Sequence, residues 1–169
     1  MGLFSKEKIK KKDAGVVLWG SMLIDLIPHS NILKYDLCEF GAVREEVIYI
    51  CTAYSFGIAT IYLKESLSEA EMDEIFVQGF EELNNNLNGA ITNMFQKLND
   101  CYQHAKFYML HYPIETGDEV FPNSFIDIYL INLLNNKEYP KELVDIAKQD
   151  LNAYLKNSNS FFKKSKIVK

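Results

Sequence analysis

The uncharged stretch from Val47 to Leu63 constrains the fold of this chain more than any other segment. As an α-helix it would be about 25 Å long, which is shorter than the ~30 Å hydrocarbon core of a bilayer. Its tyrosine, threonine and serine residues weaken a membrane interpretation further. Because a helix that is apolar on nearly every side must be covered by neighbours, we expect a buried central helix.

A β-hairpin is the alternative structure for the same stretch. Val, Ile, Tyr, Phe and Thr dominate it and favour strands, and residues 55–57 could form the turn. Periodicity alone does not separate a short apolar helix from a strand. We favour the helix because no other segment offers strands that would complete a sheet, and two strands alone are only marginally stable.

Signals for helices recur along the rest of the chain. Ser68 and Glu71 have the spacing of a capping box, and Asn88-Gly89 supplies a stop through residues that tolerate positive φ. Asp13 is expected to cap a first helix that ends before Pro28. Further helices are expected over residues 31–41, 90–112, about 125–133 after Pro122, and 141–155.

Length and composition complete the prediction of the fold. A chain of 169 residues can bury one sizeable core. We therefore expect an all-α, single-domain, bundle-like array of six or seven helices around the central apolar helix. The three cysteines, Cys38, Cys51 and Cys101, are odd in number and lack CxxC spacing, which indicates free thiols in a reducing, cytoplasmic environment. Abundant Ile, Asn, Tyr and Lys are typical of an AT-rich bacterial or phage genome.

Charge divides the sequence into three parts. Residues 1–12 contain five lysines and one glutamate, and residues 156–169 contain five lysines and no acid. Residues 13–155 contain eight basic and 22 acidic residues, a net charge of −14. We expect an acidic helical domain with a basic tail at each end, and a basic protein as the partner of the acidic surface. The same surface makes nucleic acid an unlikely partner.

The basic tails also contain apolar residues. Leu3 and Phe4 precede the first lysines, and Phe161-Phe162 precede Lys163-Lys164. Lysines beside aromatic residues suit an anionic membrane surface or a phosphate backbone, so weak membrane contact through the tails is one interpretation. Solvated ends, or ends that dock on the acidic surface of the chain itself, are the others.

The sequence contains no recognisable motif for catalysis or for binding a metal or nucleotide. Asp100, His104 and His111 share one face of a predicted helix, and that face lies about 120° from the apolar stripe. We therefore expect these side chains to face solvent. Seven residues separate the two histidines, roughly 10.5 Å along a helix, which is too far for two ligands of one ion. No metal, cofactor or catalytic residue is expected.

Asp25 is the only charged residue in the apolar run 14–27. A carboxylate buried there would have a raised pKa and could act as an acid or base. A place at the solvent edge of an amphipathic helix is the simpler interpretation. Four aromatic residues could line a pocket with this carboxylate, although such residues more often belong to the core: Trp19, Tyr49, Tyr54 and Tyr62.

The sequence favours a non-enzymatic interaction or regulatory protein, such as an inhibitor, an immunity or antitoxin-like protein, or an adaptor. Regular helices without a convergent polar cluster offer no evident place for chemistry. One alternative is a small helical enzyme or ligand carrier with an aromatic-lined pocket inside the bundle. The other is a peripheral membrane protein that attaches through its basic and aromatic tails. The oligomeric state stays open.

Overall fold

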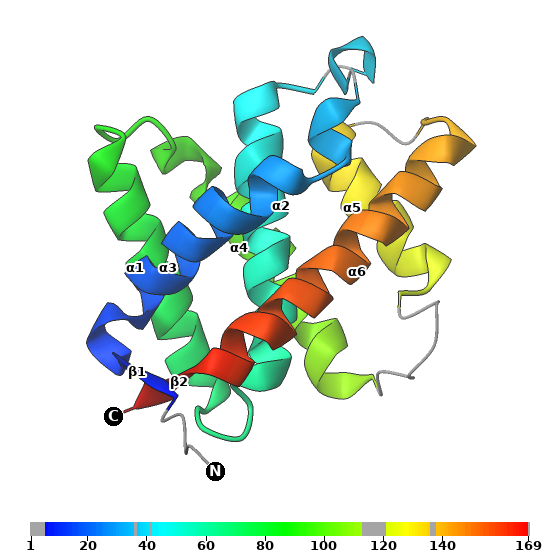
Figure 1. Ribbon diagram of the computed structural model, residues 1–169. Coiled ribbons are helices and arrows are strands. Elements are labelled where there is room, and N and C mark those ends of the chain that lie inside the picture. Colours follow the sequence, from blue (N-terminus) through cyan, green and yellow to red (C-terminus); the bar gives the residue numbers. More distant parts are fainter. Residues whose placement is uncertain (1–5, 36, 41, 113–120, 136–137, 169) are drawn as a thin grey trace.

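The computed structural model describes residues 6–35, 37–40, 42–112, 121–135 and 138–168. Within these ranges it contains six α-helices and one two-stranded sheet (Figure 1), which confirms the predicted all-α fold. The helices are α1 (Lys11–Ser21), α2 (Arg44–Ala59), α3 (Glu69–Asn86), α4 (Phe95–His111), α5 (Asn123–Leu134) and α6 (Lys141–Lys164). The strands are β1 (Glu7–Lys10) and β2 (Ser165–Val168).

Helix α2 occupies the centre of the structure, and α1, α4, α5 and α6 pack around it (Figure 1). Eleven of its sixteen residues are buried, among them every residue from Ile50 to Ala59. The helix continues into a 3-10 turn over Thr60–Tyr62, so the hairpin alternative is wrong and the predicted buried helix is confirmed. In the described part of the chain, no helix combines the length and the apolar character needed to cross a bilayer.

Helix α3 begins and ends at the signals found in the sequence. The Ser68 hydroxyl accepts a hydrogen bond from the Glu71 N–H at 3.3 Å, and the Glu71 carboxylate accepts one from the Ser68 N–H at 2.9 Å. These two bonds are the predicted capping box. At the other end Asn88 and Gly89 both have positive φ, and the Gly89 N–H donates to the Asn84 carbonyl at 2.8 Å. This bond closes the helix as the sequence predicts.

Two details of the N-terminal third differ from the prediction. Asp13 does not cap α1, because extended Lys10 at the end of β1 starts the helix at Lys11. α1 then passes through a π-helical turn over Met22–Leu26 and a 3-10 turn over Ile27–His29, which contains Pro28. In place of one helix over 31–41 the chain forms two 3-10 turns, Ile32–Lys34 and Leu37–Phe40, because Tyr35 between them is extended.

Helix α6 is longer than predicted and continues from residue 155 to Lys164. Tyr154, Ser158 and Phe162 are buried at successive steps of four residues, so the stripe that faces the core continues past the expected end. The change of charge at residue 156 therefore falls inside a helix, and the change at residue 13 falls inside α1. Charge boundaries and structural boundaries do not coincide in this chain.

The two ends of the chain meet in a parallel sheet. β1 pairs with β2 in the register that sets Glu7 opposite Ser165 and Lys10 opposite Val168. Ile9 and Ile167 lie opposite each other and are both buried. Lys6 adds a hydrogen bond from its ammonium group to the Phe162 carbonyl at 2.9 Å. Both described basic ends are thus ordered against the helical body.

Helices α1 and α3 cross at two glycines. A Cβ on Gly15 would lie 2.5 Å from the Ile75 carbonyl oxygen, and one on Gly79 would run into the Trp19 ring. The indole N–H of Trp19 donates to the Phe76 carbonyl at 3.2 Å. The absence of side chains at both positions lets the helix backbones come into direct contact, and this contact fixes where β1 and the start of α1 lie along α3.

We predict that Gly79→Ala lowers the free energy of unfolding by about 2 kcal/mol, because overpacking a tight contact costs roughly 1–3 kcal/mol. Gly20→Ala is the matched control, since a Cβ there would meet no atom within 4 Å. Its better helix propensity is expected to add up to about 1 kcal/mol. Urea unfolding followed by circular dichroism measures both variants, and equal stability of the two would contradict the close contact.

Candidate functional site

Helix α3 concentrates negative charge on the molecular surface. It contains six acidic residues and no lysine or arginine: Glu69, Glu71, Asp73, Glu74, Glu81 and Glu82. Like charges three or four residues apart on a helix repel each other. Glu69 with Asp73 and Glu71 with Glu74 are two such pairs, so this helix depends on cations supplied from elsewhere.

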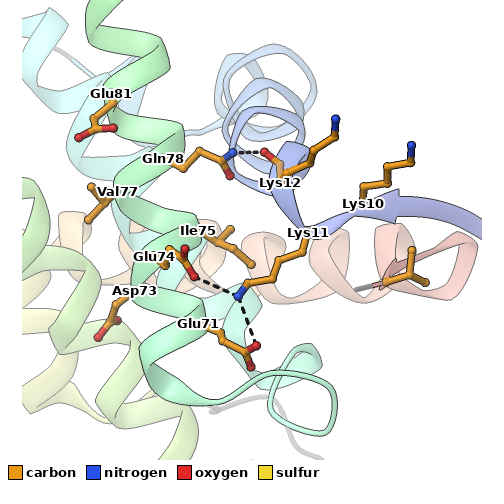
Figure 2. Close-up of a pocket in the computed structure, with 11 residues that line it drawn as sticks. Lys10, Lys11, Lys12, Glu71, Asp73, Glu74, Ile75, Val77, Gln78 and Glu81 are labelled. Atoms are coloured by element: carbon orange, nitrogen blue, oxygen red, sulfur yellow. Dashed lines mark hydrogen bonds and ion pairs between the residues drawn. The ribbon is translucent and has the colours of Figure 1, made fainter.

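Lys11, at the start of α1, bridges the carboxylates of Glu71 and Glu74. Its ammonium nitrogen lies 3.3 Å from the Glu71 carboxylate and 3.0 Å from that of Glu74, so that one cation bridges both acids (Figure 2). The Glu74 carboxylate raises the pKa of Lys11. The pKa of Glu71 is lowered, chiefly by the hydrogen bond from the Ser68 backbone N–H and next by the Lys11 ammonium group. The basic N-terminal segment therefore docks on the acidic surface of its own chain.

Lys106, on α4, bridges the carboxylates of Glu69 and Asp73 from the opposite side of α3. Its ammonium nitrogen lies 2.7 Å from Asp73 and 3.9 Å from Glu69, and it sits 5.4 Å above the centre of the Tyr102 ring. Lys106 is only 5% exposed. A buried ammonium group is unfavourable unless it is paired and hydrogen-bonded, so these partners are what make its position tolerable.

Glu81 and Glu82 remain without such a bridge. Both are exposed, and no lysine, arginine or histidine in the described ranges forms an ion pair with either. Glu81 lies on the wall of an open groove of about 1090 Å³ between α3 and the junction of β1 with α1. On the facing wall in Figure 2, the Lys10 and Lys12 ammonium groups point away from α3.

The groove is held together by more than the Lys11 bridge. Gln78 of α3 donates from its side-chain amide to the Lys12 carbonyl, and its oxygen accepts from the Gly15 N–H at 3.2 Å. Ile75 and Val77 supply apolar surface to the lining, and Val168 of β2 reaches it from the end of the chain. The result is a groove with carboxylates of α3 on one wall and, on the other, Lys10 and Lys12, whose ammonium groups point away from α3.

The aromatic residues proposed as a pocket lie in different parts of the molecule. Trp19 is buried between α1 and α3, and Tyr54 is buried where α2 faces α4 and α5. The Tyr62 hydroxyl donates to the Leu155 carbonyl at 3.3 Å. Tyr49 is half-buried, and burial raises its pKa. These side chains serve the core in separate places.

Asp25 is exposed in the π-helical turn after α1. It lines a second open cavity of about 380 Å³ that also touches α6, with His29 and Lys164 among the other lining residues. No hydrogen bond from a described residue reaches its carboxylate. The structure thus places Asp25 at the solvent edge of its helix, the simpler of the two interpretations of the sequence.

The expected solvent-facing cluster on α4 holds for Asp100 and His111, which are exposed, and is wrong for His104. α5 packs over this part of α4, and the His104 ring stacks on Phe125 with centroids 4.4 Å apart. The Tyr54 hydroxyl, which accepts from Asn132, lies 3.0 Å from Nδ1 of His104. Burial lowers the pKa of His104. Among the described residues, no three His, Cys, Asp or Glu gather as metal ligands would.

We predict that stability falls as the pH drops below about 6.5, the ordinary pKa of histidine. The unfolded chain takes up a proton there, whereas folded His104 stays neutral until its lowered pKa is reached, so acid favours unfolding. His104→Gln should reduce this dependence, and His111→Gln should retain it. Urea unfolding between pH 7.5 and 5 measures the difference; identical profiles for the two variants would contradict the assignment.

A buried carboxylate in α6 was missed by the sequence analysis. Asp150 is 1% exposed and accepts hydrogen bonds from the Ser30 hydroxyl, the Asn31 N–H at 2.8 Å and the Ile32 N–H at 2.9 Å. The network continues through Tyr154 and Tyr129 to Cys51, whose pKa burial raises to about 11. The sequence signal for the burial of Asp150 was its position, because residues 143, 147, 150 and 154 share one helix face.

We predict that Asp150→Ala lowers the free energy of unfolding by roughly 2–4 kcal/mol, because it leaves buried donors without an acceptor. The Asp150 carboxylate therefore has a structural role, as it anchors the turn after α1 to α6. Asp145→Ala, at an exposed position of the same helix, should change stability by less than about 0.5 kcal/mol. Calorimetry or urea unfolding compares the two, and a loss shared equally by both would contradict the anchor.

The acidic helix α3, with Lys11 and Lys106 from other helices, is a charged cluster that the fold assembles from distant segments and leaves partly open. The excess of acid in residues 13–155 is visible in the sequence, whereas the bridging roles of Lys11 and Lys106 are not, because they depend on how the helices pack. Comparison with protein-family models, with curated proteins and with solved structures finds no match for this chain.

Proposed function

We propose that this chain is a non-enzymatic binding protein whose acidic helix α3 receives a basic segment of a protein partner. The observation that carries the proposal is the difference among the six acids of α3. Four of them are bridged by lysines from other helices, whereas Glu81 and Glu82 are exposed and unbridged within the described residues.

The bridges inside the molecule indicate how such a partner would bind. Lys11 and Lys106 each place one ammonium group between two carboxylates of α3. Glu81 and Glu82 are consecutive residues whose side chains do not face each other, so a lysine or arginine of the partner would pair with each of them separately. Charge complementarity of this kind raises association rates and suppresses wrong partners more than it adds affinity.

The groove beside α3 gives the partner a defined place. Its α3 wall carries Glu81 and the apolar side chain of Val77, so a segment with a basic residue next to an apolar one would fit it. Lys10 and Lys12 line the other wall with their ammonium groups pointing away from α3, so their charge disfavours a second cation on that side of the groove. Such a surface would serve an inhibitor, an immunity or antitoxin-like protein, or an adaptor.

We further propose a reducing, cytoplasmic location. Cys51 and Cys101 are buried and form no disulfide. Burial raises the pKa of Cys51 to about 11 and that of Cys101 to about 12. Thiols held in the neutral form react slowly, which suits a core that persists without disulfides.

The test is binding kinetics with a partner recovered from the native host at low salt and then purified. Glu81→Gln with Glu82→Gln should lower the association rate roughly tenfold at low salt and flatten its salt dependence. The matched control is Glu45→Gln with Asp145→Asn, which removes the same charge from exposed positions on α2 and α6. It should change the rate less than twofold.

Two results would contradict the proposal. One is recovery of partners that are neutral or acidic and bind at a rate independent of salt. The other is an equal loss in both double variants, which would show that only the overall charge of the protein matters. Circular dichroism of each variant confirms that the fold is retained before the rates are compared.

A further inference from the structure

The terminal sheet places like charges side by side. Lys8 of β1 lies directly opposite Lys166 of β2, and both side chains are exposed. Their neighbours Ile9 and Ile167 are buried on the other face of the sheet. Like charges that face each other across a strand pair are destabilising. A short sheet that carries such a pair gains from an anion bound beside it.

Other lysines surround this pair. The exposed lysines on the two strands and on the helix ends next to them are Lys8, Lys10, Lys12, Lys163, Lys164 and Lys166. Two acids, Glu7 and Asp13, lie among them, and Glu74 and Glu81 lie across the groove on α3. The bridge from Lys11 already occupies Glu74. Positive charge therefore predominates at this end of an otherwise acidic molecule.

An exposed apolar stripe begins at the same place. Every fourth residue from Lys12 lies on the outer side of α1 and of the turn that follows it, which gives Val16, Gly20 and Ile24. Val16 is 42% exposed and Ile24 is 75% exposed, and nothing lies within 4 Å of a Cβ on Gly20. In Figure 1, α1 runs from β1 across the front of the molecule with no other element in front of it.

From these two features we infer that the terminal sheet and the outer side of α1 form a docking surface for an anionic lipid membrane. Lysines beside a helix face with an exposed isoleucine and valine match the interface of a bilayer, where anionic headgroups border an apolar interior. A nucleic acid phosphate backbone would satisfy the lysines but leave Ile24 without a partner. The lipid surface is therefore the occupant that both observations support.

This surface borders the groove proposed for a basic protein and shares Lys10 and Lys12 with it, but the two tests change different residues. The membrane surface uses lysines and Ile24, whereas the protein site uses Glu81 and Glu82 of α3. A planar membrane can touch the basic end while the acidic bulk points away, and charges beyond about 8 Å are screened at physiological ionic strength. Either proposal can fail without the other.

The experiment is sedimentation of the full chain with vesicles of phosphatidylcholine alone or with 30% phosphatidylserine. Binding is expected only to the anionic vesicles, and it should weaken as salt is raised. Lys8→Gln with Lys166→Gln should weaken binding roughly tenfold, and Ile24→Ser roughly fivefold. The matched control, Lys64→Gln with Lys141→Gln, removes two exposed lysines elsewhere and should weaken binding less than twofold.

Folding does not obscure this test, because loss of the Lys8 and Lys166 repulsion should leave the melting temperature unchanged or higher. Ile24→Ser changes a residue that is already exposed and provides a second, independent variant. The inference is overturned by equal binding to both kinds of vesicle, by no binding to either, or by an equal loss in the control. Binding of the same lysines to duplex DNA, without binding to anionic vesicles, would overturn it in favour of a nucleic acid partner.

Discussion

Burial of α2 on every side is the constraint on which the rest of this structure depends. A helix without a polar face can be stable in water only when other helices surround it, and α1, α4, α5 and α6 do so here. Helix α4 approaches α2 closely at Gly57, where a Cβ would lie 2.6 Å from the Cβ of Ala105. This contact fixes α4, and with it the neighbouring residue Lys106, which holds α3.

The acidic helix α3 is therefore linked to the core through charge as well as through packing. Lys106 bridges two of its carboxylates from the α4 side, and Lys11 bridges two others from the α1 side. The bridge from Lys106 is the stronger constraint, because its ammonium group is buried and needs its partners, whereas exposed ion pairs are screened by water and salt. Like charges on one helix are tolerated where the fold supplies a cation between them. Glu81 and Glu82 are the carboxylates of this helix for which the described residues supply none.

The parallel sheet gives the two chain ends a common position that neither end has alone. Two strands are marginally stable in isolation, but here Ile9 and Ile167 bury one face of the pair against the helical body. The other face collects lysines from positions more than 150 residues apart. Separate basic tails thus become one basic surface next to the exposed side of α1, and the charge of that surface is opposite to that of α3.

Local patterns in the sequence predicted the buried helix α2 and both ends of α3, but they also predicted one helix over 31–41, where the structure has two 3-10 turns, and ended α6 too early. The capping box at Ser68 and Glu71, the stop at Asn88-Gly89 and the uncharged stretch at 47–63 act within a few residues, so they keep their meaning whatever the rest of the chain does. The excess of acidic residues in 13–155 could also be read directly from the sequence. Only the tertiary structure decided which faces meet. α5 covers His104, and the turn after α1 donates hydrogen bonds to Asp150. Trp19, Tyr54 and Tyr62 pack in separate parts of the core. The bridges from Lys11 and Lys106 and the pairing of β1 with β2 belong to the same class, because they join residues far apart in the chain whose contact depends on how the helices pack around α2.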